Sequence, residues 1–115
     1  MPDWRKTLQR EHDGQPGTFL FHLRSGPGWD FAAYDILFAA LLECCKHHHN
    51  SDDIPRWTAE LFWRLDWYVR QDLKRRYADA IPARYENCWT NLNHLAHWLF
   101  TGESRSDDDF EPTGD

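Results

Sequence analysis

The sequence predicts an all-α fold: a small bundle of three principal helices with a shorter amino-terminal helix or extended segment. Three long segments, 31–46, 54–77 and 82–100, carry apolar residues at helical spacing and are separated by Gly- or Pro-containing breaks. A chain of 115 residues has room for one domain, and its 16% aromatic residues supply large rings for one core. We therefore predict a single helical domain over 1–102 and a separate tail over 103–115.

The amino-terminal part is the least defined. Residues 3–12 are predicted to form a short helix, since Trp4 and Leu8 lie four apart on one face. Residues 13–17 end it, and the apolar run 18–23 has no clear period, so a strand and a helical turn both remain open. A lone strand would have no partner for its backbone groups, which favours a helix or an extended packing segment for residues 15–24.

The first long helix, 31–46, follows a break at 25–28 and is predicted to have Asp30 as its N-cap. Apolar residues cover nearly its whole circumference, which predicts a central place in the bundle. One face carries Phe31, Tyr34, Phe38, Leu41, Leu42 and Cys45. Most of the other side carries Ala33, Ile36, Leu37, Ala40 and Cys44. Only a narrow strip is predicted to face water: Asp35, Ala39, Glu43 and Lys46.

The other two long helices are ordinary amphipathic ones. Asp53, followed by Ile54 and Pro55, is predicted to open the segment 54–77. Its expected core face is Ile54, Trp57, Leu61, Phe62, Leu65, Tyr68, Val69 and Leu73. Pro82 separates it from the last helix, which ends at Gly102. That helix is expected to bury Tyr85, Cys88, Trp89, Leu92, Leu95, Ala96 and Leu99.

The charge of the chain is concentrated at its end. Residues 103–115 contain six acidic residues and one arginine, a balance of −5 out of a total of −6, which leaves −1 for residues 1–102. This composition predicts a disordered acidic tail. The tail would keep the protein soluble, bind a basic partner, or lie against the basic residues of its own body. Those residues are Arg70, Lys74, Arg75 and Arg76.

The cysteines and the amino terminus favour a soluble cytoplasmic protein. Cys44, Cys45 and Cys88 have no spacing typical of a metal or redox motif, and free buried thiols suit a reducing compartment. The first residues lack the basic-then-apolar order of a secretory signal, and no stretch is long enough to cross a bilayer.

Tryptophan and basic residues off the core faces are the candidate binding residues. Trp63, Trp67, Arg70 and Lys74 fall in one narrow arc opposite the core, which suits protein recognition or stacking on nucleic-acid bases. The alternative is that the amino-terminal segment packs over the rings. Trp98 shares a polar face with Asn87, Asn91 and His94, so it would contact a second copy or another protein, or pack under the tail.

Histidine spacing raises a second hypothesis, a site for zinc or another transition metal. His94 and His97 lie three apart, and Glu43 and His47 four apart, so each pair presents two ligands on one helix face. The Glu43–His49 segment would supply the remaining ligands. The alternative is that the histidines at 47–49 are protonated at a helix C-terminus, where the helix dipole favours a cation.

No catalytic motif is present. The chain contains no glycine-framed serine, phosphate-binding loop or dinucleotide fingerprint, so nothing argues for an enzyme. Cys88 with His94 or His97 would be a nucleophile pair, but Cys88 is predicted to face the core, where a thiol is inert. Asp72 and Arg76 are predicted to form a solvated pair at the end of their helix.

Together these patterns predict a non-enzymatic protein-binding module, such as a small inhibitor, immunity-type or adaptor protein, that binds another protein or a second copy of itself. A metal-binding helical protein is the first alternative. Binding of single-stranded nucleic acid is the second, and the nearly neutral body and the acidic tail argue against it.

Overall fold

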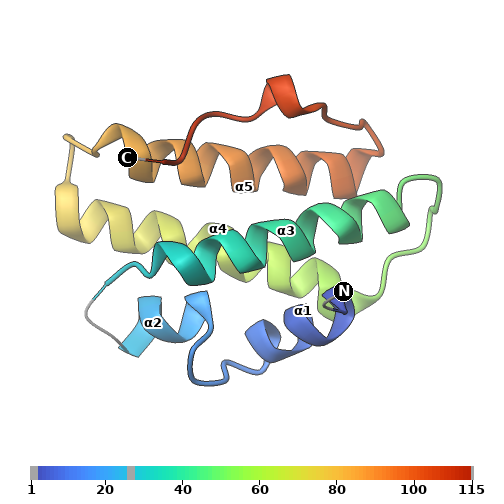
Figure 1. Ribbon diagram of the computed structural model, residues 1–115, viewed down its shortest axis with the longest axis horizontal. Helices are drawn as coiled ribbons and strands as arrows, with labels where there is room; N and C mark the ends of the chain where they lie inside the picture. Colours follow the sequence, from blue (N-terminus) through green and yellow to red (C-terminus); the bar gives the residue numbers. More distant parts are fainter. Residues whose placement is uncertain (1–2, 26–27, 115) are drawn as a thin grey trace.

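The computed structural model describes residues 3–25 and 28–114, and within them all regular structure is helical. The helices are α1 (Trp4–His12), α2 (Phe19–Ser25), α3 (Phe31–His47), α4 (Arg56–Tyr77), α5 (Ala83–Thr101) and the short 3-10 helix η1 (Asp107–Asp109) (Figure 1). The prediction of an all-α fold is confirmed. None of the helices described has the length and apolar character required to cross a membrane.

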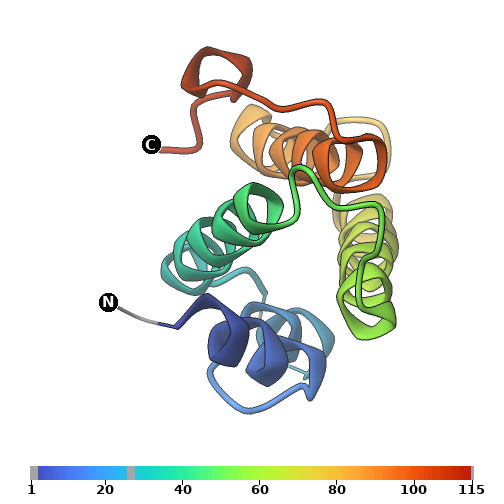
Figure 2. The same cartoon turned by 90° about the vertical axis from the view of Figure 1, so that its right-hand side faces the viewer.

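The bundle has four sides. Viewed nearly along the long helices, α3 and α4 form opposite walls, α5 closes one side and the α1–α2 pair closes the other (Figure 2). The two short helices together therefore occupy the position of one long helix in the bundle. Side chains from all five α-helices meet in one buried core, which includes Leu8, Phe19, Leu37, Leu65 and Leu95.

In the run 18–23, which the sequence left open between strand and helix, residues 19–23 belong to α2 and Thr18 directly precedes it. Two side chains hold the first turn of α2 in place. The Thr18 hydroxyl accepts a hydrogen bond from the backbone N–H of Phe21 at 3.3 Å. The buried carboxylate of Glu11, on α1, accepts from the N–H groups of Phe19 and Leu20 at 2.9 and 3.1 Å. These donors would otherwise lack partners at a helix start, so Glu11 both starts α2 and fixes it to α1.

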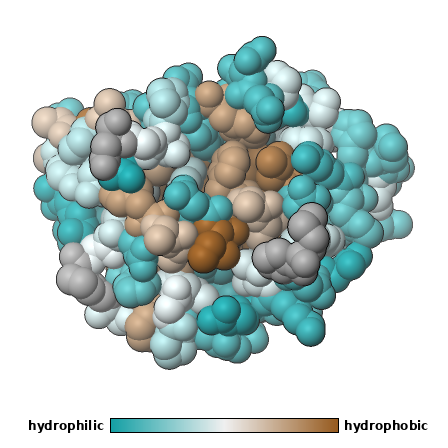
Figure 3. Space-filling view, in the orientation of Figure 1, coloured by the Kyte–Doolittle hydropathy of each residue, from teal (hydrophilic) through white to brown (hydrophobic). Residues whose placement is uncertain are grey.

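Helix α3 begins as predicted, because Asp30 accepts a hydrogen bond from the N–H of Ala33 at 3.1 Å. Residues 26–27 of the predicted break before it lie outside the described residues. The central placement of α3 is wrong on one side. Ile36 is 63% exposed, so α3 is an outer wall and not an enclosed helix. Hydrophobic side chains gather near the middle of the face that α3 crosses (Figure 3).

The ends of α4 and α5 differ slightly from the prediction. Helix α4 begins at Arg56, and Pro55 occupies its N-cap position without a side-chain hydrogen bond, so Asp53 does not cap it. Helix α5 ends at Thr101, and Gly102 follows in the left-handed conformation with φ of 79°, which is the usual role of glycine at a helix C-terminus.

The predicted disorder of the acidic tail is not confirmed, and the structure describes its residues 103–114 in a defined path. The tail folds back along α5 (Figure 1), and Phe110 packs on the core with its ring centroid 5.2 Å from that of Phe38. The composition argument considered only the surface that the tail itself could bury. It did not include the side chains of α3 and α5 that the tail contacts. In the described part of the tail, residues 103–114, the hydrogen bonds and ring contacts to the helices are with α3 and α5 and not with Arg70 or Lys74 of α4.

Candidate functional site

The outer face of α4 carries two exposed tryptophans. Trp63 is 63% exposed and Trp67 is 41% exposed, and they lie four residues apart, so their rings follow one another along the helix. Large aromatic rings are mostly buried in folded proteins, which makes two neighbouring exposed ones the strongest surface signal in the described residues.

The amino-terminal helices do not cover these rings. Phe19 is fully buried in the core, and Trp4 packs against His47 with ring centroids 5.4 Å apart. Helix α1 contacts α4 through His12: its Nε2 lies 2.8 Å from Glu60 Oε1, and its carbonyl accepts a hydrogen bond from Arg64 at 3.2 Å. The alternative that the amino-terminal segment shields Trp63 and Trp67 is therefore wrong.

A groove of about 380 Å³ runs between α2 and α4 next to Trp67. The ring of Trp67 meets Tyr68 edge-on at 5.2 Å, and the guanidinium of Arg24 lies over the Tyr68 ring at 5.0 Å. The groove thus combines aromatic faces with cations. Its lining is Leu23, Arg24, Trp67, Tyr68, Gln71, Asp72 and Arg75.

Asp72, in the wall of this groove, is buried, so the prediction that it is solvated is wrong. Its side chain is 3% exposed and accepts hydrogen bonds from Trp29 Nε1 at 2.7 Å, Arg75 at 3.0 Å and Arg76 at 2.9 Å. The hydrogen bond to Asp72 raises the pKa of Arg76. A buried carboxylate needs such partners, and in satisfying it Arg75 is held at the edge of the groove.

The two basic candidates on the α4 face differ in their freedom. Arg70 forms an ion pair with Asp66, and the other oxygen of Asp66 accepts a hydrogen bond from Trp89 Nε1 at 2.9 Å. Arg70 is thus part of a connection between α4 and α5. Lys74 is exposed, one turn beyond Arg70 on the same face. No described residue forms an ion pair with Lys74, so its charge is open to a partner.

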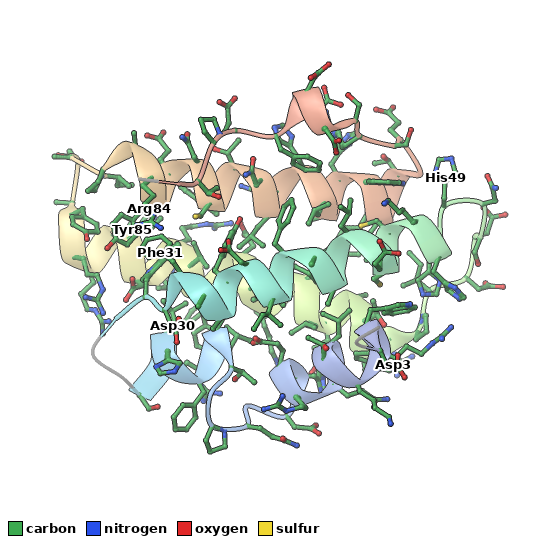
Figure 4. The ribbon with its side chains drawn as sticks, in the orientation of Figure 1. Asp3, Asp30, Phe31, His49, Arg84 and Tyr85 are labelled. Carbon is green, nitrogen blue, oxygen red and sulfur yellow. The ribbon has the colours of Figure 1, made fainter. Side chains whose placement is uncertain are left out.

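Trp98 does not belong to an exposed surface. It is 5% exposed, and its Nε1 donates a hydrogen bond to His49 Nδ1 at 3.1 Å. The helical wheel placed it on a polar face, but the loop that follows α3 folds over the end of α5 and encloses the ring. Figure 4 shows His49 at that end of the molecule. The polar neighbours Asn87 and Asn91 are covered by the tail instead.

The histidines do not assemble as metal ligands. His94 faces the Phe110 ring at 6.3 Å, whereas His97 Nδ1 lies 3.1 Å from Arg105. In residues 3–25 and 28–114, no group of three or more His, Cys, Asp or Glu side chains is placed to hold a metal ion. At His48, burial and the neighbouring His47 and Arg5 lower the pKa, which opposes the protonation that the helix dipole favours.

Cys88 is buried, and its surroundings do not favour a nucleophilic thiolate. Burial raises its pKa to about 11, and it raises those of Cys44 and Cys45 to about 12. Thiols with such values are protonated near neutral pH and react slowly. The prediction that all three cysteines are free and buried is confirmed.

Sequence reasoning found the tryptophans of this site but missed the groove beside them. Arg24 lies in the segment whose structure was undefined, and Tyr68 was assigned to the core, although it is only half-buried. Assignment of residues 19–25 to a helix would have indicated the groove, because this helix places Arg24 beside α4.

The fold and the site define an all-helical chain with an aromatic and basic surface on α4. Comparison with protein-family models, curated proteins and solved structures finds no significant match to it.

Proposed function

We propose that the chain is a non-enzymatic protein-binding module, such as a small inhibitor, immunity-type or adaptor protein, that acts through the outer face of α4. The exposure of Trp63 and Trp67 on successive turns carries this proposal. Tryptophan and arginine are the residues most enriched among those that dominate binding energy at protein interfaces. A cytoplasmic location belongs to the proposal and is supported by the three free cysteines.

The surroundings of the rings indicate the chemistry of the partner. The groove beside Trp67 has Arg24 and Arg75 at its edges, and Lys74 lies on the adjoining face. A partner with an apolar side chain to insert beside Trp67 and carboxylates around it would match both the rings and the cations.

A matched set of variants tests this proposal. A partner captured with the intact chain is titrated by calorimetry against the double variant Trp63→Ala and Trp67→Ala, with Ile36→Ala as the control. Ile36 is as exposed as Trp63 but lies on α3. Loss of residues that dominate an interface costs at least about 2 kcal/mol, so the double variant should bind about thirtyfold more weakly. Equal affinity of double variant and intact chain, with the helical circular dichroism spectrum retained, would refute it.

Single-stranded nucleic acid is the second candidate partner, and one observation favours it. The acidic tail, which argued against nucleic acid, lies along α5 and not over the cations of α4 (Figure 2). Arg24 and Lys74, which are both exposed, therefore remain available for phosphates beside rings that stack on bases. Oligonucleotide binding that weakens steeply with salt would support this function, and salt-independent binding would exclude it.

A further inference from the structure

The carboxyl-terminal segment makes an unusual kind of contact with α5. It runs antiparallel to the helix, from η1 back toward the start of α5 (Figure 1). Three consecutive backbone carbonyls of the segment accept hydrogen bonds from α5 side chains. The carbonyl of Glu111 accepts from Asn91 at 2.9 Å, that of Pro112 from Asn87 at 2.8 Å, and that of Thr113 from Arg84 Nε at 2.8 Å.

Asn91 contacts the backbone of Glu111 twice. Its Nδ2 donates to the carbonyl, and its Oδ1 accepts from the N–H of the same residue at 2.8 Å. A side-chain amide that pairs with both groups of one residue imitates a neighbouring β-strand, and it requires the segment to be extended there. Asn91 itself is 3% exposed, so this amide is buried and fully used by the segment.

One donor of this row also contacts the body of the bundle. The guanidinium of Arg84 lies 3.5 Å from the ring centroid of Phe31, on α3. Figure 4 shows both residues at the end of the bundle toward which the segment runs. Asn87 and Asn91 lie one turn apart on a packed helix. A preorganised row of this kind recognises backbone, which any extended peptide shares.

Side-chain selectivity comes from the residues around Phe110. Its ring inserts between Phe38 of α3, at 5.2 Å, and His94 of α5, at 6.3 Å. The preceding residue, Asp109, accepts hydrogen bonds within the segment itself, from the N–H of Ser106 at 2.8 Å and from its hydroxyl at 3.4 Å. Pro112 follows, and its carbonyl is the only backbone hydrogen-bonding group that it has to offer.

We propose that the site between α3 and α5 binds an extended peptide of another protein, in which an aromatic residue is followed two positions later by proline. The carboxyl-terminal segment of the chain is its resident occupant and competes with that partner. Recognition through backbone groups and one ring does not depend on the covalent link to α5. This site is separate from the α4 face and does not rest on the function proposed for it.

A synthetic, fluorescently labelled peptide of residues 105–114 provides the test. It is titrated by fluorescence anisotropy against the full-length chain and against full-length Phe110→Ala, whose own segment has lost its anchor. The peptide should bind Phe110→Ala saturably. Its affinity for the unaltered chain should be lower by about tenfold or more, because the tethered segment competes at high effective concentration. A peptide with the phenylalanine replaced by alanine should lose binding to Phe110→Ala.

Two further variants separate this site from simple charge attraction and from misfolding. Glu111→Pro removes the N–H that donates a hydrogen bond to Asn91 Oδ1, and it leaves the Phe110 ring unchanged. It should therefore open the site as Phe110→Ala does. Adding Trp63→Ala and Trp67→Ala to Phe110→Ala should leave peptide binding unchanged, because the peptide does not use α4.

Three results would overturn the proposal. The first is equal affinity of the peptide for the unaltered chain and for both opened variants. The second is equal binding of a scrambled peptide of the same composition. The third is no binding to either opened variant while its circular dichroism spectrum matches that of the unaltered chain.

Discussion

Glu11 offers a direct test of how the amino-terminal pair of helices is held. Its carboxylate is the only acceptor that the described structure gives to the N–H groups of Phe19 and Leu20, and the residue is 3% exposed. Glu11→Ala leaves both donors without a partner in a buried place. Each buried unpaired donor costs about 1–3 kcal/mol, so the variant should lose about 2–6 kcal/mol of unfolding free energy. That is a large fraction of the roughly 5–15 kcal/mol typical of a small domain.

Urea unfolding followed by tryptophan fluorescence measures this loss. Glu11→Gln serves as the matched control, because its amide oxygen still accepts a hydrogen bond, and its loss should be smaller than that of Glu11→Ala. The slope of free energy against urea should stay constant if both variants keep the fold. A loss below about 0.5 kcal/mol for Glu11→Ala, which is the range of ordinary surface substitutions, would refute the proposed role of Glu11.

The pH dependence of the same pair of proteins tests the burial of Glu11. Burial raises the pKa of its carboxyl above the ordinary 4.5, and the hydrogen bonds from Leu20 and Phe19 oppose this only in part. A raised folded-state pKa gives stability that is present below pH 4.5 and is lost as the pH rises through the folded value. The stability of the unaltered chain minus that of Glu11→Gln should therefore fall with rising pH across this window. A difference that grows with pH would contradict the raised pKa.

Three other predictions follow from buried or exposed groups. Trp29→Phe removes the donor to Asp72 and should cost about 2 kcal/mol in urea unfolding, whereas no change would mean that the arginines alone satisfy the carboxylate. The three buried thiols should react with a disulfide reagent at pH 8 only as fast as the chain unfolds, and rapid labelling without urea would contradict their raised pKa values. Trp63→Phe should reduce acrylamide quenching of the fluorescence more than Trp98→Phe, because Trp63 is 63% and Trp98 5% exposed; the reverse order would contradict the placement of both rings.

The helices of this chain could be predicted because local signals define them. Asp30 caps α3 and Gly102 ends α5 as the sequence indicated, and the apolar spacing located all three long helices. Helix α2 was less accessible, because its first turn depends on Glu11, which lies in a different helix. No pattern within residues 18–23 contains that information.

The candidate site could be predicted only for residues whose surroundings lie on one helix. Trp63 and Trp67 follow from the helical wheel of α4, and both are exposed. The same reasoning failed for Trp98 and Asp72. Trp98 is covered by the loop that carries His49, and Asp72 is enclosed by Trp29, which lies more than 40 positions away in the sequence. Contacts between distant segments decide such cases, and a wheel contains none of them.

The two proposed binding sites are supported by different parts of the bundle, and this makes them separable by experiment. The α4 face uses exposed rings and cations, so substitutions there should leave the fold and the tail unchanged. The α3–α5 site is occupied and depends on a buried amide, Asn91, whose hydrogen bonds within the described residues are made with the extended segment. A partner that uses the α4 face should bind whether or not the tail is docked. A partner that uses the α3–α5 site must first displace Phe110, so weakening that anchor should increase its affinity and leave the affinity of an α4 partner unchanged.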